Sequence, residues 1–213
     1  MIKIFAHRGF VANGAKENSI NSLNEAYKNH FLGIEFDIWF VENQLYIHHD
    51  QPQKEDLATI PTLKDYLVYG NHFEYWMDFK NLDEHNASAA IELAKKEIMA
   101  AKIDPKKIYF APFITNFDEA ILVYKKIIKA FEAAQIMAVC EDIKKEELVL
   151  YHQNLQKNHI RFLSIRHVFV DEEFIKIFNG ITLFAWTVND LERLGQLEKI
   201  GVKNLTSDKI KPL

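Results

Sequence analysis

Polar side chains with the chemistry needed to cleave a phosphodiester gather in short segments of the first 80 residues. The segments are Ala6-His7-Arg8-Gly9, Glu17-Asn18-Ser19, Glu35-Phe36-Asp37, His48-His49-Asp50 and Asp78-Phe79-Lys80. Carboxylates hold hard divalent cations, and histidines transfer protons near neutral pH. Arginine and lysine neutralise phosphate oxygens. The combination predicts a metal-dependent site that acts on a phosphodiester.

Three acidic residues are the predicted ligands of the cation. Glu35 and Asp37 lie two apart on a predicted strand, so both point to the same side while Phe36 points to the other. Two enclosed carboxylates repel each other unless a cation lies between them. Asp78, at the end of another strand, is the third predicted ligand. The alternative for Glu35 and Asp37 is that they lie at a solvated strand end. The alternative for Asp78 is an ion pair with Lys80. Oxygen ligands of this kind favour Mg²⁺ or Ca²⁺ over zinc.

Two histidines, His7 and His49, are predicted to act as general acid and general base. Displacement at phosphorus needs a base for the incoming oxygen and an acid for the leaving one, and these oxygens lie on opposite sides. His7 and His49 belong to different elements and can therefore approach from different directions. On a strand His48 faces away from His49, so only one of them is expected to enter the site. A structural role is the alternative for a lone histidine.

Arg8 and Lys80 are the predicted phosphate-binding residues. Their alternative role is a salt bridge with Glu17 or Asp78. Trp186 ends a later apolar segment, and we expect it either to wall the pocket or to belong to the core.

Short apolar segments alternate with longer amphipathic ones, which is typical of a parallel sheet connected by helices. Predicted strands are Ile2–Ala6, Gly33–Phe40, Tyr75–Phe79, Ile108–Ala111, Ile136–Val139, Arg161–Ile165, Leu183–Thr187 and Lys203–Thr206, with an additional Leu45–His49. Predicted helices are Ser19–His30, Pro61–Tyr69, His85–Lys102, Asp118–Ala134, Lys144–Asn158, Asp171–Asn179 and Asp190–Ile200.

This alternation favours a compact (β/α)8 barrel. An open doubly wound sheet is the alternative, but the chain has no G-x-G-x-x-G turn. In a barrel the candidate residues His7, Asp37, Asp78 and Trp186 all lie at the C-terminal strand ends, where barrel enzymes build their sites.

Composition limits the class of protein. A chain of 213 residues with 48% hydrophobic and 26% charged residues is typical of a soluble globular protein, and we expect residues 1–213 to form one domain. The formal net charge of −4 disfavours a nucleic-acid-binding protein. The apolar segments are too short for a signal peptide or a membrane-spanning helix, which predicts a cytoplasmic location. The partner predicted from the polar site residues is a small-molecule phosphodiester.

A set of motifs follows one order along nearly the whole chain. The motifs are His7-Arg8-Gly9, Glu17-Asn18-Ser19, Glu35-x-Asp37, His49-Asp50, Ile60-Pro61-Thr62-Leu63, Asp78-x-Lys80, Trp186-Thr187-Val188-Asn189, and Gly201-Val202 with Thr206-Ser207-Asp208. This order resembles the glycerophosphodiester phosphodiesterase family. The resemblance implies a barrel enzyme that uses one divalent cation to cleave a glycerol phosphodiester into glycerol phosphate and an alcohol.

The resemblance also implies roles for single residues. The cation ligands would be Glu35, Asp37 and Asp78, with His7 and His49 as acid and base. In the same way Arg8 would bind phosphate, Glu17 would orient that cluster, and Lys80 would support the ligand beside it. A neighbouring hydroxyl of the substrate can attack phosphorus first in this family, which gives a cyclic phosphate.

Two departures from the family pattern leave alternatives open. The third ligand is usually Glu, and Asp78 in its place is more similar to the related spider-venom-type phospholipase D enzymes, so a lyase or phosphodiesterase for another headgroup is one alternative. A catalytically silent barrel that binds phosphorylated ligands is another. In the family a longer insertion after the motif at His49-Asp50 helps to recognise glycerol, and here only the segment 51–60 is present. This short segment predicts an open entrance to the site and weak discrimination between alcohol groups.

Overall fold

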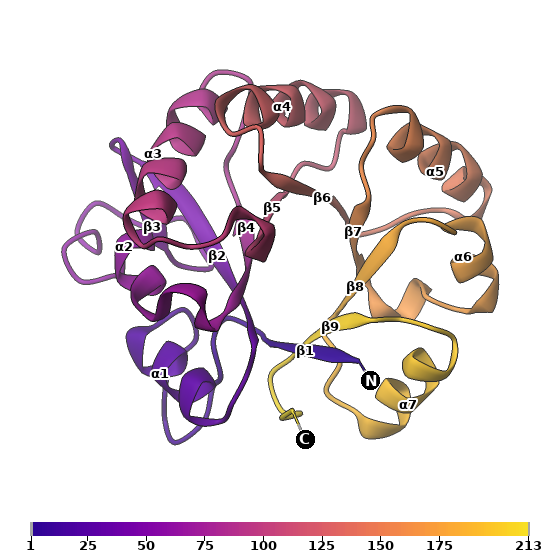
Figure 1. Ribbon diagram of the computed structural model, residues 1–213, viewed down its shortest axis with the longest axis horizontal. Helices are drawn as coiled ribbons and strands as arrows, with labels where there is room; N and C mark the ends of the chain where they lie inside the picture. Colours follow the sequence, from indigo (N-terminus) through magenta and orange to yellow (C-terminus); the bar gives the residue numbers. More distant parts are fainter. Residues whose placement is uncertain (1, 213) are drawn as a thin grey trace.

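The computed structural model describes residues 2–212, which form a closed barrel of parallel strands surrounded by helices (Figure 1). The barrel strands are β1 Lys3–Ala6, β2 Gly33–Val41, β4 Glu74–Phe79, β5 Ile108–Pro112, β6 Gln135–Cys140, β7 Phe162–Arg166, β8 Thr182–Trp186 and β9 Asn204–Ser207. Strand β1 pairs with both β2 and β9, which closes the sheet. Strand β3, Gln44–Ile47, pairs antiparallel with β2 outside the barrel. The predicted (β/α)8 barrel is confirmed.

The helices lie in a ring around the strands (Figure 1). They are α1 Ile20–Lys28, α2 Leu63–Tyr66, α3 Ala87–Ala100, α4 Phe117–Ala130, α5 Leu148–Lys157, α6 Glu172–Ile177 and α7 Leu191–Lys199. Each lies within a predicted helical segment, apart from Phe117 at the start of α4. The segment predicted as one helix at Pro61–Tyr69 is instead the short α2, which ends because Leu67 leaves the α-helical backbone, followed by a 3₁₀ segment, Leu67–His72.

The core has two layers. Inside the barrel, large side chains fill the axis and contact one another edge to face, as do Phe5 and Trp76, whose ring centroids are 6.2 Å apart. Trp76 and Phe184 make a similar contact at 5.4 Å. The larger layer lies between the strands and the helices. Because side chains fill the barrel interior, the polar groups at the C-terminal strand ends line a cavity outside that packed interior.

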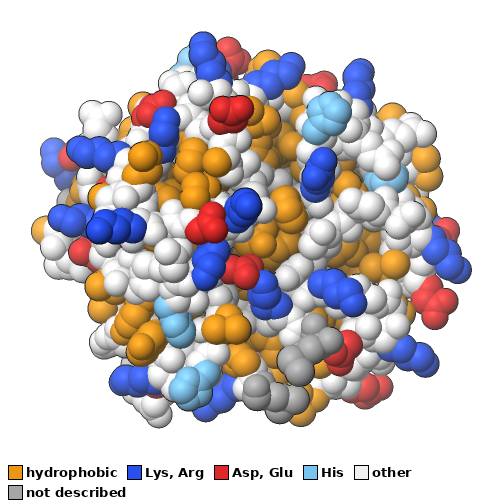
Figure 2. Space-filling view, viewed as in Figure 1, with side chains coloured by type: hydrophobic (Ala, Val, Ile, Leu, Met, Phe, Trp, Pro, Cys, Tyr) orange, Lys and Arg blue, Asp and Glu red, His pale blue; other side chains and the backbone are white. Residues whose placement is uncertain are grey.

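The surface carries charges of both signs. On the face seen in Figure 2, Lys and Arg side chains are interspersed with acidic and apolar ones and do not merge into one basic surface. Within the described residues, no helix combines the length and apolar character needed to cross a membrane.

Candidate active site

A cavity of about 240 Å³ lies at the C-terminal ends of the barrel strands. It is lined by His7, Arg8, Glu35, Asp37, His49, Trp76, Asp78, Lys80, Phe113, Val139, Glu141, Ser164, Trp186 and Thr206. The structure therefore brings together every predicted catalytic, ligand and substrate-contacting residue. Glu17 lies just outside and reaches the cavity through Arg8, whose Nη1 donates to a Glu17 oxygen at 3.0 Å.

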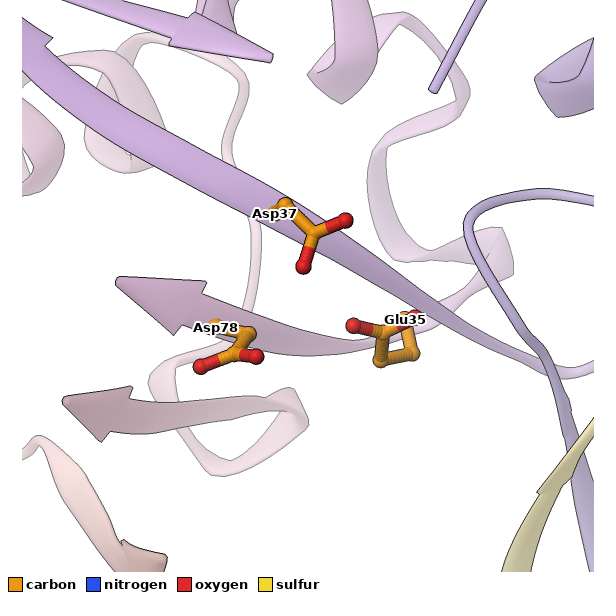
Figure 3. A group of neighbouring side chains, drawn as sticks. All are labelled: Glu35, Asp37 and Asp78. Carbon is orange, nitrogen blue, oxygen red and sulfur yellow. The ribbon is translucent and has the colours of Figure 1, made fainter. Parts of the chain in front are cut away.

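Three carboxylates converge in this cavity (Figure 3). Glu35, Asp37 and Asp78 each offer an oxygen, and these atoms lie within 4.8 Å of one another. Burial raises the pKa of Glu35 to about 7, and the charges of Asp37 and Asp78 add to this effect. Burial also raises the pKa of Asp78 to about 6 against the opposing charge of Lys80. Glu35 is 4% exposed, and the buried Asp78 Oδ1 has no hydrogen-bond partner. Three mutually repelling carboxylates and the unpartnered Asp78 oxygen fit a divalent cation, which would stabilise the ionised forms.

Among the three carboxylates, Asp37 is held in place by hydrogen bonds with Asn18. It is 1% exposed, and the Asn18 side-chain amide donates to its Oδ2 at 2.7 Å. The Asp37 backbone N–H donates back to the Asn18 side-chain oxygen at 3.3 Å. Asn18 can face the site because Ser19 is the residue that caps α1, accepting from the Ser22 backbone N–H. Asn18 thus holds one carboxylate in place.

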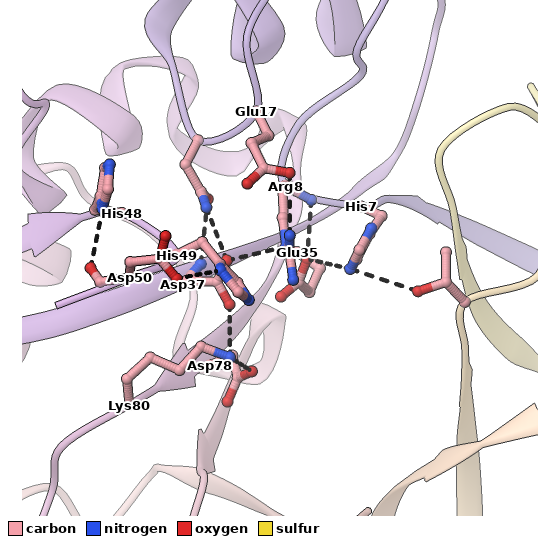
Figure 4. Close-up of polar contacts among 12 residues, drawn as sticks. His7, Arg8, Glu17, Glu35, Asp37, His48, His49, Asp50, Asp78 and Lys80 are labelled. Carbon is pink, nitrogen blue, oxygen red and sulfur yellow. Dashed lines mark hydrogen bonds and ion pairs between the residues drawn. The ribbon is translucent and has the colours of Figure 1, made fainter.

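The two basic residues bind the carboxylates directly (Figure 4). Lys80 Nζ lies 2.7 Å from Asp37 Oδ1 and 2.6 Å from Asp78 Oδ2. Arg8 Nε lies 3.1 Å from Asp37 Oδ2, in addition to its contact with Glu17. The salt bridges that the sequence offered as an alternative are present. Both cations also line the cavity, where they stay close to any phosphate that enters.

His7 is held by residues from the far end of the chain. Its Nδ1 lies 2.6 Å from Asp208 Oδ1, and the Asn189 amide donates to the other Asp208 oxygen at 2.7 Å. His7 Nε2 points toward Glu35, 3.9 Å away. Burial by itself would lower the pKa of His7, but Glu35 and Asp208 together raise it above its ordinary value. The two carboxylates thus stabilise the imidazolium form of His7, and the contact with Asp208 fixes the orientation of its ring.

As predicted, His49 lines the cavity and His48 does not, but alternation along a strand is not the cause. His49 lines the cavity and its Nδ1 lies 2.9 Å from Asp50 Oδ1. His48 is outside the lining and contacts the Asp50 backbone oxygen at 2.9 Å. Strand β3 ends at Ile47, so both histidines lie in the following turn. The turn separates them, and the predicted alternation along a strand reaching His49 is wrong.

Trp186 and residues without a predicted role complete the cavity lining. Trp186, half-buried, both packs on the barrel interior and lines the cavity, so its two predicted alternatives hold together. The indole N–H groups of Trp76 and Trp186 and the Thr206 hydroxyl are buried without a hydrogen-bond partner within the described residues. Such groups are available to a bound ligand.

Gly9 places the loop that carries His7 and Arg8, which leads to a first prediction. Its φ is +77°, and a Cβ there would lie 2.3 Å from Ser22 Oγ. We expect Gly9→Ala to lower the free energy of unfolding by about 1–3 kcal/mol more than Gly14→Ala does. Gly14 is the matched control because its φ is +80° but a Cβ would meet nothing within 4 Å. Urea denaturation of both variants measures the difference; equal losses would contradict the expected clash.

The buried carboxylates predict how stability depends on pH in cation-free protein. A folded-state pKa above the unfolded value means that protonation favours folding. The contribution of Asp78 and Glu35 is fully present below about pH 4 and is lost as pH rises through about 6 and about 7. We expect Asp78→Asn to flatten this decline and to be more stable than wild type at pH 8. Chemical denaturation in EDTA from pH 4 to pH 8 tests this, and parallel curves for the two proteins would refute it.

The fold and the site together define a class of protein. It is a (β/α)8 barrel with a cavity at the C-terminal ends of its strands, lined by acidic, histidine and basic side chains. The chain resembles a solved glycerophosphodiester phosphodiesterase from Parabacteroides distasonis, with a TM-score of 0.78, 21% identity, and coverage of 97% of this chain and 92% of that one. It also resembles an Oleispira antarctica phosphodiesterase in complex with the product sn-glycerol-3-phosphate, with a TM-score of 0.79, 18% identity, and coverage of 97% and 92%.

A glycerophosphodiester phosphodiesterase from Thermotoga maritima gives a TM-score of 0.72 at 18% identity, with coverage of 98% of this chain and 95% of that one. No protein-family model matches the chain, and no curated protein sequence does. At these identities the likeness shows a shared fold. The solved structures it resembles are those of the family that the sequence motifs resemble.

Proposed function

We propose that this protein hydrolyses a glycerophosphodiester to glycerol phosphate and an alcohol with the help of one divalent cation. The observation that carries the proposal is the meeting of three acidic, two histidine and two basic side chains in one cavity. The likeness to phosphodiesterases, one of them solved with glycerol phosphate, supports the same substrate class.

Glu35, Asp37 and Asp78 are the residues that would hold the cation, Mg²⁺ or Ca²⁺. Bound there, the cation would supply positive charge that offsets the negative charge developing on the phosphate oxygens. Arg8 and Lys80 bind the same phosphate and orient it. Glu17 keeps the Arg8 guanidinium extended into the cavity through the 3.0 Å contact.

The two histidines move protons at opposite sides of phosphorus. One accepts the proton of the attacking hydroxyl, either water or the neighbouring glycerol hydroxyl, and the other donates a proton to the leaving alcohol oxygen. Attack by the glycerol hydroxyl forms a new P–O bond, breaks the bond to the alcohol, and leaves a cyclic phosphate that water then opens. The raised pKa of His7 suits the proton donor. Asp208 holds its ring in orientation.

A lyase that stops at the cyclic phosphate is the second candidate. The observation that favours it is Asp78 at the position of the third ligand, where the resembled phosphodiesterases usually have Glu. The two candidates share every residue of the site and differ in product.

A panel of diesters tests the proposal. Purified protein is incubated with glycerophosphocholine, glycerophosphoethanolamine and glycerophosphoglycerol in Mg²⁺, Ca²⁺ or Mn²⁺, and released glycerol phosphate is quantified. Glycerol phosphate is expected from diesters, with no phosphate released from the monoester glycerol phosphate. Cleavage of none of these diesters with any cation would defeat the proposal.

A further inference from the structure

A cavity of about 610 Å³ lies in the outer ring of helices and shares no lining residue with the candidate active site. It runs between α3 and the segment formed by α2 and the 3₁₀ turn Leu67–His72, which are neighbours in the ring (Figure 1). Because α2 has only four residues, it covers part of the 14-residue α3 and leaves space beside the rest. The residues that line this outer cavity are Gln44, Lys64, Leu67, Val68, Gly70, Leu93, Lys96, Glu97, Ala100 and Ala101.

Two lysines give the outer cavity a positive charge. Lys64 belongs to α2 and Lys96 to α3, so the two side chains come from opposite walls. Both residues are exposed, and neither forms an ion pair or a side-chain hydrogen bond within the described part of the chain. Two ammonium groups that face one space without a bound partner attract an anion.

Glu97 is the acidic residue of the lining, and burial weakens its charge. Its Oε2 is buried and has no hydrogen-bond partner among the residues described. Burial raises the pKa of Glu97 to about 7, and the charge of Asp65 adds to this effect. Lys64 and Lys96 oppose it. Asp65 itself is outside the lining, and its carboxylate accepts hydrogen bonds from Thr62. A carboxyl group that keeps its proton near neutral pH can donate a hydrogen bond to an anionic ligand.

The rest of the wall is apolar. Leu67 and Val68 follow α2, and Leu93, Ala100 and Ala101 line the α3 side. Val68 is 70% exposed, so a ligand with an apolar chain would remove this surface from water, which favours binding. Apolar walls with a few placed polar groups are typical of sites for small molecules.

We propose that the outer cavity binds a small amphipathic carboxylate, an anionic head group on a short apolar chain. The head group lies between Lys64 and Lys96, and the chain lies along Leu67 and Val68. A carboxylate suits Glu97, since two adjacent carboxyl groups readily share one proton. This site is separate from the candidate active site, so the proposal does not depend on phosphodiesterase activity.

Octanoate is the probe, and acetate and octanol are its controls. Binding to the purified protein is measured at pH 6 by titration followed in two-dimensional proton–nitrogen NMR spectra. We expect octanoate to bind at least about tenfold more tightly than acetate, which lacks the chain, and than octanol, which lacks the charge. The amide signals that shift should belong to residues 64–70 and 93–101.

Removing both positive charges tests the binding of the head group. The double variant Lys64→Gln/Lys96→Gln should bind octanoate at least about tenfold more weakly than the wild type does. Lys102→Gln is the matched control, because Lys102 is an exposed lysine just after α3 that does not line the cavity, and it should keep the wild-type affinity. Equal affinities of the wild type and the double variant would overturn the proposal.

Val68→Asp tests the apolar wall. The exposed position tolerates a polar side chain, and the variant replaces apolar surface with a charge that repels the anion. Octanoate affinity should fall by at least about tenfold. Leu122→Asp is the control, since Leu122 is an exposed apolar residue of α4 outside the cavity lining, and its affinity should stay near that of the wild type. Undiminished binding to Val68→Asp would place octanoate elsewhere.

The part played by Glu97 is visible in the pH dependence of binding. Wild-type affinity should fall as pH rises from 6 to 8, because Glu97 loses its proton in this range while octanoate stays ionised. In Glu97→Gln the amide is a permanent donor, so the affinity should be the same at both pH values. The same pH dependence in both proteins would contradict the shared proton.

Two further outcomes are decisive. Tighter binding of octyl phosphate than of octanoate would overturn the assignment to a carboxylate. Octanoate binding that does not saturate, or that shifts only amide signals of the candidate active site, would overturn the outer cavity as a ligand site. Saturable binding that depends on the lysines, on Val68 and on Glu97 in the directions given would establish it.

Discussion

Replacing His7 or His49 with alanine is expected to lower kcat/KM by about 10²- to 10⁴-fold each, the usual range for one general acid or base. Both side chains line the cavity that contains the three carboxylates. His48→Ala is the matched control, because His48 lies in the same turn as His49 but outside the cavity lining, and it should retain most activity. Steady-state kinetics with one glycerophosphodiester measure all three variants.

The pH profile separates a catalytic role of His7 from a structural one. If protonated His7 donates to the leaving oxygen, wild-type kcat should fall as pH rises through its raised pKa. Asp208→Asn removes the carboxylate that helps to raise this pKa, so the fall should move to lower pH. Equal losses at His48 and His49, or an alkaline limb that Asp208→Asn does not move, would contradict these roles.

Replacing Asp37 with asparagine is expected to remove nearly all turnover. Asp37 is the most buried of the three candidate ligands and contacts Arg8, Lys80 and Asn18. The variant loses a ligand charge and two ion pairs, so we expect weaker cation binding by at least about tenfold, measured by calorimetric titration with Mn²⁺. Its circular dichroism spectrum should remain that of the wild type.

Glu17→Gln is a useful comparison for this variant. Glu17 contacts Arg8 from outside the cavity, so cation affinity should change little while KM rises. Cation affinity that is the same in wild type and Asp37→Asn would show that the cation, if it binds, is held elsewhere.

Much of the fold follows from local patterns in the sequence. Each predicted strand overlaps an observed one, because each is a short apolar segment bounded by helical periodicity. Glu35 and Asp37 were predictable as a pair because a strand repeats every two residues. The exceptions are local as well. The predicted strand Leu45–His49 ends at Ile47, which leaves His48 and His49 in a turn, and the predicted helix Pro61–Tyr69 is α-helical only as far as Tyr66.

The partners that complete the site were harder to predict because they depend on barrel closure. Asp208 is 201 residues from His7, and the two meet only because β9 pairs with β1. The sequence placed Asn18 in a motif but gave it no role in the site; Ser19 caps α1, and the Asn18 side chain contacts Asp37 instead.

The most direct measurement for the central claim is a phosphorus-31 NMR time course with glycerophosphoethanolamine and the purified protein in Mg²⁺, followed by excess EDTA and then by renewed Mg²⁺. The account predicts that the diester signal is replaced by glycerol phosphate, with or without a transient cyclic phosphate, that conversion stops in EDTA, and that it resumes when the cation is restored. A cyclic phosphate that accumulates without being opened would favour the lyase. A diester signal that stays unchanged throughout, or that disappears at the same rate in EDTA, would contradict a metal-dependent phosphodiesterase.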